Sequence, residues 1–479
     1  MNPMKLPELL FEIATHLDST GDIIRLAQTD RFSHEMVLPF LFRDIDISFA
    51  AVSSLAAALR RTATLGNTCR SLVFRRALDE LSDKDEDYDD EEEPDDDEPD
   101  WTVYAPLYTD LCTIFHALSA HSCLRRISLK WNARRYLGTD VEFPSEVWGA
   151  ISAASSHLEA LEISVGVTEE RDWQILMVGT IPNLRVFDLQ MAAHGWECAY
   201  LQEFLDKHPS IEDLTLELPT CCGPEGITLE STFPALKAFA MNAPRLTVGD
   251  SSFLERHPRL ERLRLDTVQQ FSLNGQGLHN LRAMYITHSI AWCLPAFSFS
   301  LTGSLTPITH LRLRSQPDLS HATVAEVVGT VAGTLRCLEL DQVDEEAFTV
   351  LLVHIRGLMQ LAPNLAELAI VAREWPKPPR WDEKNLINLL AAIDDSTLVA
   401  LRVVHYKSGM PLPPSVLTDL GPVPSSLKYI GWDVPRQPIT YAIGRLGDKN
   451  IGRAMACSPF PREGEGWTAE SVLDHLGPC

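Results

Sequence analysis

A hydrophobic pattern of the form apolar-x-x-apolar-x-apolar recurs along most of this 479-residue chain. Its first regular copy begins at Leu124 and its last at Leu427, and successive copies begin 21 to 34 residues apart. The last two apolar positions of each copy alternate as on one face of a β-strand. The residues between copies must return the chain to the start of the next strand. The period therefore predicts parallel strands that lie side by side, an architecture that suits a chain too long for one ordinary core.

The segments that join these strands carry apolar residues at helical spacing. Leu201, Phe204 and Leu205, for example, are separated by three and four residues, as on one face of a helix. The 21-residue unit before Leu281 is too short for a long helix. We expect an earlier copy of the pattern at Cys69 to begin the stack, and helices at 107–121, 144–157, 196–208, 320–333, 344–362 and 381–393.

The average period of about 27 residues resembles that of leucine-rich repeats. The resemblance implies an α/β fold, a leucine-rich-repeat solenoid over residues 48–433, with parallel strands on the concave face and helices on the convex face. The Asn that such repeats place eight residues after the first apolar position occurs only as Asn132. We therefore expect turns that close in different ways and an uneven curvature.

The last residues depart from the period, as a cap must, because a terminal repeat leaves one face uncovered. Residues 439–443 and 451–456 flank the turn-forming residues 447–450, which predicts a hairpin. We assign residues 434–479 to this cap, whose tail carries an apolar stripe of Trp467, Val472, Leu473 and Leu476.

Acidic residues dominate the charge of the chain, and most of the excess is local. The formal net charge is −25, yet residues 79–100 alone contain sixteen acidic residues and one Lys. This run has almost nothing apolar to bury, so it predicts a solvated, disordered insertion within the solenoid. The acidic balance also argues against nucleic acid as a partner, because binding to phosphates relies on Lys and Arg.

No motif typical of catalysis or of a cofactor site occurs in the sequence. An apparent calcium loop that begins at Asp83 has Tyr88 where Gly is required and Pro94 where a bidentate Glu is required. The ten cysteines are scattered without a CxxC pair, which favours buried thiols over zinc sites or disulfides. The sequence therefore predicts a protein that is not an enzyme and holds no metal and no cofactor.

Targeting signals are likewise missing from the sequence. The amino terminus lacks the apolar core of a signal peptide, and the most apolar inner stretch, residues 347–361, is interrupted by His354 and Arg356. We expect a soluble protein of the cytoplasm or nucleus, without a membrane partner.

Three histidines recur where the expected helices approach their ends. A cation at such a place interacts favourably with the negative end of the helix dipole. We interpret them as structural residues of this kind: His157, His208 and His257.

The first 47 residues carry a second pattern, that of short helices. Pro7 suits the first turn of a helix because its φ is fixed and it has no N–H to satisfy. Asp22 can cap a second helix. Three helices this short cannot bury their apolar surface alone, so a partner or the following domain must cover it. The apolar positions are Leu6, Leu9, Leu10, Ile13 and Leu17 in the first helix and Ile23, Leu26 and Ala27 in the second.

This order of residues resembles an F-box, and the layout of head and repeats is similar to that of F-box proteins of filamentous fungi. In that family, the matching stretch docks on a Skp-type adaptor, which joins it to a cullin–RING ubiquitin ligase. The resemblance implies that residues 1–47 are an F-box and that the solenoid holds a target protein. Its adaptor-binding residues would be Leu6, Pro7, Leu9, Leu10, Ile13, Leu17, Ile23 and Leu26.

Two other interpretations of the same pattern remain. The head is also compatible with a plain helical cap on the solenoid. The whole chain is also compatible with a protein-interaction scaffold built on leucine-rich repeats that joins no ligase. Binding of the adaptor distinguishes the receptor from the scaffold.

Alternate strand positions are expected to point away from the buried side chains, which gives a charge map of the open face. The middle units carry cations and the units on either side carry acids. We hypothesise that the centre binds an acidic or phosphorylated segment of the target, with residues 79–100 as an alternative occupant; solvation alone also explains exposed arginines. The central residues are Arg262, Arg264, Tyr285, His310, Arg312 and Arg314, and the flanking acids are Glu162, Asp188, Asp213, Glu217, Glu339, Asp341 and Glu367.

Overall fold

The chain divides into two compact units: Met1–Leu236 with Met241–Arg245, and Lys237–Ala240 with Leu246–Cys479. Within the part of the chain that the structure describes, no helix has both the length and the hydrophobicity required to cross a membrane. The structure, a computed structural model, describes residues 7–17, 20–75, 105–130, 143–165, 170–191, 199–218, 229–242, 252–266, 270–274, 278–287, 298–302, 308–314, 321–343, 345–372, 383–393, 396–404, 412–434, 437–446 and 449–455.

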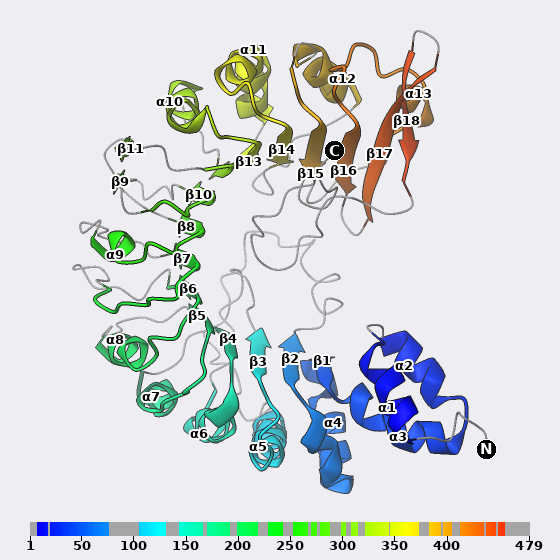
Figure 1. The fold of residues 1–479 in the computed structure, drawn as a ribbon, viewed down its shortest axis with the longest axis vertical. Coiled ribbons are helices and arrows are strands. Elements are labelled where there is room, and N and C mark those ends of the chain that lie inside the picture. Colours follow the sequence, from blue (N-terminus) through cyan, green and yellow to red (C-terminus); the bar gives the residue numbers. More distant parts are fainter. Residues whose placement is uncertain are drawn as a thin grey trace, which may run out of the picture. The chain divides into compact units, whose positions relative to one another are not determined.

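Three short helices begin the first unit: α1 (Pro7–Thr15), α2 (Thr20–Ala27) and α3 (Arg31–Leu41) (Figure 1). Asp30 caps α3, because the Ser33 N–H donates to its Oδ1 at 2.8 Å and so satisfies one amide that the helix start leaves unbonded. The helices enclose a small apolar core of their own, whereas we expected a partner or the following domain to cover it. This core contains Ala14, Ile23, Ala27 and Val37, with Leu17, Leu26, Phe40 and Leu41 packed against it.

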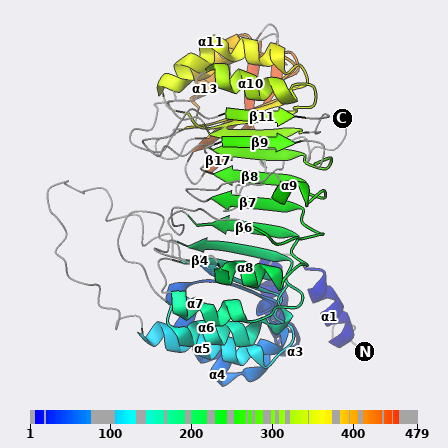
Figure 2. The same ribbon diagram turned by 90° about the vertical axis from the view of Figure 1, so that its left-hand side faces the viewer.

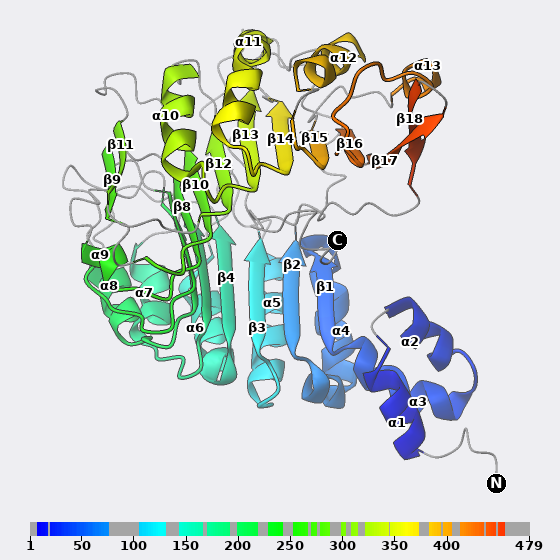
Figure 3. The same ribbon diagram turned by 45° about the horizontal axis from the view of Figure 1, so that its top comes forward.

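Six parallel strands follow the head in the first unit, each paired with the next in chain order. Helices cover one face of this sheet, and no described helix or strand covers the other, which is called the open face below (Figures 1 and 3). The strands are β1 (Asp44–Ser48), β2 (Ser71–Arg75), β3 (Arg126–Lys130), β4 (Ala160–Val165), β5 (Val186–Met191) and β6 (Asp213–Glu217), and the helices are α4 (Val52–Arg61), α5 (Ala105–Ser119), α6 (Ser145–Ala154), α7 (Glu170–Val178) and α8 (Ala199–Asp206).

The strand register aligns the periodic apolar positions. Ile127 pairs with Leu161, and Leu161 with Phe187, so each second apolar position lies opposite the next. These side chains are fully buried between the sheet and its helices. Burial of one such side chain stabilises the fold by roughly 1.5–3 kcal/mol, so the period accounts for most of the cohesion between neighbouring strands. The aromatic ring of Phe74 extends the same core, with ring centroids 5.6 Å from Phe49 and 6.1 Å from Phe115.

The second unit repeats this arrangement with seven parallel strands in the order β8, β10, β12, β13, β14, β15 and β16. The helices expected at 320–333, 344–362 and 381–393 form within a few residues of those bounds. The strands are β8 (Arg262–Asp266), β10 (Ala283–Thr287), β12 (His310–Arg314), β13 (Cys337–Val343), β14 (Glu367–Ala372), β15 (Ala400–Val404) and β16 (Tyr429–Val434), and the helices are α9 (Ser252–Glu255), α10 (His321–Val331), α11 (Glu345–Leu361), α12 (Glu383–Ala392) and α13 (Pro414–Leu417). A further strand, β7 (Ala238–Asn242), lies where the chain passes between the units.

Two short strands take the place of helices in the second unit. β9 (Gln270–Asn274) and β11 (Ser298–Thr302) form a separate two-stranded parallel sheet, in which Phe271 pairs with Phe299 and Leu273 with Leu301 (Figure 2). The unit before Leu281 was expected to be too short for a long helix, which agrees with the strand β9. We had not predicted either strand, although both share the sequence Phe-Ser-Leu.

The expected carboxyl-terminal hairpin is confirmed. β17 (Gln437–Leu446) pairs with β18 (Lys449–Ala454) in antiparallel orientation, and β17 is also antiparallel to β16. β17 is longer than the sequence indicated, whereas β18 has the expected length and begins two residues earlier. The expected tail and the acidic run at 79–100 lie outside the described residues.

Candidate functional site

The head presents a smaller apolar surface than the sequence predicted. Leu10 is fully buried, and Ile23, 8% exposed, belongs to the core of the head, so these two residues are not available to an adaptor. Their assignment to adaptor binding is therefore corrected. Leu9 is 41% exposed. Ile24, which the sequence analysis missed, is equally exposed, and Ile24 follows the buried Ile23 on the surface of α2.

The other predicted head residues lie between these extremes. Pro7 and Ile13 are half-buried, and Leu17 and Leu26 are half-buried against the head core. Leu6 lies outside the described residues. Among the described side chains of the head, the large apolar ones that remain exposed are Leu9 and Ile24.

The predicted cationic centre of the second unit forms one row across neighbouring strands. Tyr285 on β10 pairs with Arg264 on β8 and with Arg312 on β12. Both guanidinium groups stack on the Tyr285 ring, with their Cζ atoms 5.3 Å and 4.8 Å from its centroid. Cation–π contacts of this kind stabilise by about 0.5–2 kcal/mol each. The expected neighbourhood of Arg264, Tyr285 and Arg312 is thus present.

The centre is not an open cationic site, however. The Nη2 of Arg312 donates to Asp341 Oδ2 at 3.0 Å, and its Nε lies 3.1 Å from Glu339 Oε1. The Tyr285 hydroxyl donates to the same Asp341 oxygen at 3.0 Å, and Tyr285 is only 5% exposed. The expectation that Tyr285 and Arg312 bind an acidic segment is therefore corrected, because Tyr285 is buried and donates to Asp341, and because flanking acids already neutralise Arg312.

The remaining predicted residues of the centre differ in exposure. Arg262 is exposed and Arg264 half-exposed on β8. His310 is half-buried, with its Nδ1 2.8 Å from the Thr309 hydroxyl. The side chain of Arg314 is outside the described set, although its backbone pairs with Asp341. The exposed positive charge therefore concentrates on β8.

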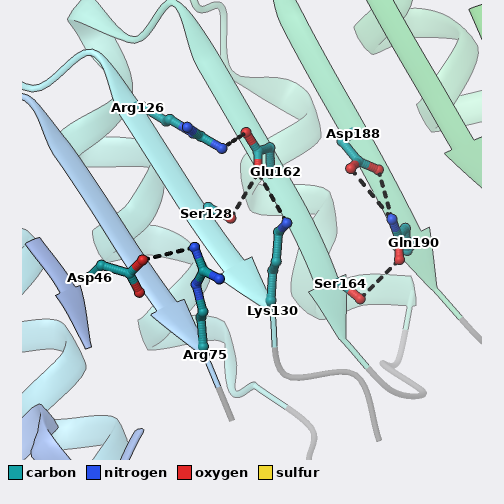
Figure 4. A network of polar contacts seen from close by, with 9 residues as sticks. All are labelled: Asp46, Arg75, Arg126, Ser128, Lys130, Glu162, Ser164, Asp188 and Gln190. Carbon is teal, nitrogen blue, oxygen red and sulfur yellow. Dashed lines mark hydrogen bonds and ion pairs between the residues drawn. The ribbon is translucent and has the colours of Figure 1, made fainter. Parts of the chain in front are cut away.

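The open face of the first unit carries a polar network centred on Glu162 (Figure 4). Arg126 Nη2 lies 2.6 Å from one Glu162 oxygen, while Ser128 donates to the other at 2.9 Å and Lys130 Nζ lies 3.9 Å from it. Arg75 pairs with Asp46 at 2.8 Å on the neighbouring strands. The cations on β2 and β3 are thus paired with acids on β1 and β4.

Asp188 lies on the acidic side of that network. Its backbone pairs with Glu162, and its carboxylate accepts hydrogen bonds from the Gln190 amide at 3.3 and 3.4 Å, while Ser164 donates to the Gln190 carbonyl (Figure 4). Burial, reinforced by the charges of Glu217 and Glu162, raises the pKa of Asp188 to about 7. This carboxyl group therefore gains or loses a proton near neutral pH.

Two histidines behave differently from the sequence expectation. His208 and His257 are each only 1% exposed, and burial lowers the pKa of both. The Ile181 N–H donates to His208 Nε2 at 2.8 Å, so Nδ1 carries the proton and donates to Phe204 O at 2.6 Å. These histidines are therefore neutral hydrogen-bonding residues, and their interpretation as cations at helix ends is wrong.

The described cysteines and possible metal-binding groups can be compared with the requirements of reactive thiols and metal sites. Cys69 is buried, and burial raises the pKa of its thiol to about 12, which makes it a poor nucleophile. Cys112, Cys123 and Cys337 are half-buried free thiols. No group of three or more His, Cys, Asp or Glu side chains with metal-binding geometry occurs among the described residues.

Because comparison with known proteins identifies no family, a function can be proposed only from the surfaces described above. The exposed apolar residues of the head and the charged open faces of the two sheets are the features that a binding partner would meet. The chain matches no protein-family model and no curated protein sequence.

Proposed function

We propose that the chain is the substrate-recognition subunit of a Skp–cullin–F-box ubiquitin ligase. The head α1–α3 binds the adaptor as an F-box, and the periodic sheet, as a leucine-rich-repeat solenoid, binds a target protein. The chain itself performs no bond chemistry. It acts in the cytoplasm or nucleus by holding the target close to the ligase.

The observation that carries this proposal is the order of the two parts. A small helical head, whose described side chains include the exposed Leu9 and Ile24, precedes strands and helices that alternate with a period of about 27 residues. Exposed apolar patches, unlike single exposed apolar residues, are characteristic of surfaces that a partner covers, and the proposal takes Leu9 and Ile24 as parts of such a patch. A plain cap on the repeats does not require such a surface.

Exchange of the exposed pair tests the adaptor site. Leu9→Asp/Ile24→Asp places two charges in the proposed apolar interface, which should weaken adaptor binding by at least about tenfold, since central apolar contacts contribute about 2 kcal/mol or more. Because both side chains are exposed, the head should remain folded. Affinity of the purified chain for a purified Skp-type adaptor is measured by calorimetry.

A matched control uses exposed apolar residues elsewhere. Val178→Asp/Val353→Asp introduces the same two negative charges on α7 and α11, at side chains that are 61% and 72% exposed. It should leave adaptor affinity unchanged. Equal adaptor affinity of the wild type and the head variant would contradict the proposed docking surface. A wild type that binds no adaptor at all would instead favour the scaffold without a ligase.

A further inference from the structure

We propose that the starting edge of strands β8, β10 and β13 binds an acidic, Asp- and Glu-rich segment of a second protein. The basic edge is defined by four exposed arginines: Arg259, Arg262, Arg282 and Arg336. The inference rests on the proposed function, because the acidic segment would belong to the target. The inference moves the target site away from the neutralised row around Tyr285. Of the four arginines of the basic edge, the sequence analysis had selected only Arg262.

Backbone hydrogen bonds bring the positions before these strands into one row. The carbonyl of Lys237 accepts the N–H of Glu261 at 2.7 Å, and that of Glu261 accepts the N–H of Arg282 at 2.8 Å. The carbonyl of Arg282 then accepts the N–H of Thr309 at 2.8 Å, and that of Thr309 accepts the N–H of Arg336 at 2.9 Å. Neighbouring positions in such a row are about 4.8 Å apart. Charges on this row therefore lie within reach of one extended peptide.

In the corresponding row of the first unit, two arginines pair with acids of the same row, while a third, Arg70, is exposed. Arg125 Nε lies 3.7 Å from Glu159, and Arg185 Nη1 lies 3.7 Å from Glu212, each pair on adjacent positions. In the second unit the row contains Lys237, Arg282 and Arg336 but only one acid, Glu261. No ion pair between described residues involves Arg282 or Arg336. Among the described residues, the row of the second unit thus has two exposed arginines without an ion pair, Arg282 and Arg336, against one, Arg70, in the first unit.

Two arginines of the adjoining loop and strand extend this charge. Asn280 donates to the carbonyl of Pro258 at 3.0 Å, which joins the loop before β8 to the loop before β10. Arg259 follows in that first loop, and Arg262 opens β8; both are exposed. Guanidinium groups bind carboxylates through parallel hydrogen bonds, so this arrangement suits carboxylate side chains.

The charge around the edge favours a short acidic segment over a nucleic acid. Glu339 and Asp341 lie on β13 beside Arg312. The chain as a whole carries a formal charge of −25. A long polyanion would meet these acids beyond the arginines, whereas a short acidic segment interacts with the edge alone.

Binding of a defined probe tests the inference. The probe is a fluorescein-labelled twelve-residue peptide of alternating Asp, Glu and Ser, measured by fluorescence anisotropy against the full chain. Arg282→Glu/Arg336→Glu should weaken its binding by roughly tenfold at physiological salt, and the difference should shrink in high salt because exposed charges are screened. The matched control is Arg445→Glu/Arg453→Glu, which reverses two exposed arginines on β17 and β18 and should change affinity less than twofold.

Several outcomes would overturn the inference. Equal binding by the wild type and the edge variant would remove the basic edge as the site, and tighter binding of a single-stranded RNA of equal charge would identify a different partner class. Deletion of residues 79–100 that strengthens probe binding tenfold would mean that the chain's own acidic run occupies the edge. Adaptor affinity is measured on the same samples. Retained adaptor binding with no probe binding rejects this inference alone, while probe binding without adaptor binding rejects the proposed ligase role alone.

Discussion

Asp188 shows how one carboxyl group links the open face of the first unit to pH. Glu162, directly opposite on β4, lies 2.6 Å from Arg126 and accepts a hydrogen bond from Ser128, with Lys130 nearby. Asp188 accepts hydrogen bonds from the amide of Gln190. Burial disfavours the charged form of Asp188 most strongly, and the negative charges of Glu217 and Glu162 add to this effect. These causes together raise the pKa of Asp188.

Replacement of this residue should reveal the effect on stability. The folded-state pKa of Asp188 is about 7, above the ordinary value of 3.8, so stability is full below the lower value and falls as pH rises between the two. Asp188→Asn cannot ionise. It should match the wild type near pH 3.5 and exceed it at pH 8 by up to about 4 kcal/mol, measured by urea unfolding. Asp46→Asn, an exposed carboxylate of the same face, should show no such gain; a pH-independent effect of Asp188→Asn would contradict the assignment.

At the scale of elements, buried histidines attach two helices to their surroundings. α8 ends at Asp206, and His208 accepts the Ile181 N–H from the segment that precedes β5. Just after α9, the Nδ1 of His257 lies 2.6 Å from Phe253 O, as the Nδ1 of His208 lies 2.6 Å from Phe204 O. Both rings stack on the Phe of the same turn, with centroids 4.1 and 4.4 Å apart. The sequence Phe-Leu-acid-base-His-Pro therefore marks one recurring helix end.

The lowered pKa of His208 predicts a loss of stability in acid. Protonation must break the bond from Ile181, so this stability is present above pH 6.5 and lost as pH falls below that value. His208→Gln should lower the free energy of unfolding by about 1–3 kcal/mol at pH 7.5, because the Ile181 N–H loses its acceptor. The variant should then lose less additional stability than the wild type between pH 7.5 and pH 5. His34→Gln, which changes an exposed histidine, is the control. If the stability of His208→Gln depends on pH as that of the wild type does, the explanation is wrong.

At the scale of the whole molecule, the strands and helices that hold each unit together are local neighbours in the sequence. Each strand pairs with the next one in the chain within the first unit, and burial of the periodic apolar residues joins them. An insertion between two such strands interrupts no pairing, because loop length costs little free energy once the ends are fixed. The pairing of β2 with β3 illustrates this, since residues 76–125 separate the two strands.

Removal of the acidic run should therefore have little effect on folding. Deletion of residues 79–100 raises the formal net charge from −25 to −10 and removes almost no apolar surface. The free energy of unfolding should stay within about 1 kcal/mol of the wild type, measured by urea denaturation. A deletion of equal length within α5 and the segment before it should unfold the first unit. Loss of several kcal/mol on deletion of 79–100 would show that the run belongs to the core.

The sequence by itself determined the elements whose signal is local and periodic. The strand at Arg126–Lys130, the helix at Glu345–Leu361 and the carboxyl-terminal hairpin follow from the spacing of apolar residues and from turn residues. These signals are readable because each side chain's burial is set mainly by its position within one period. That Arg264, Tyr285 and Arg312 lie on neighbouring strands was predictable in the same way, because the three residues occupy the same position in successive copies of the pattern.

Tertiary structure decided which of these residues remain accessible. Leu9 and Leu10 are adjacent and chemically identical, yet only Leu10 is buried, because packing of a helix covers only one of its sides. Arg312 is neutralised because Asp341, 29 residues later, reaches it across the strand pair. Burial and charge pairing depend on distances between side chains from different units of the period, and only the folded chain brings those side chains together.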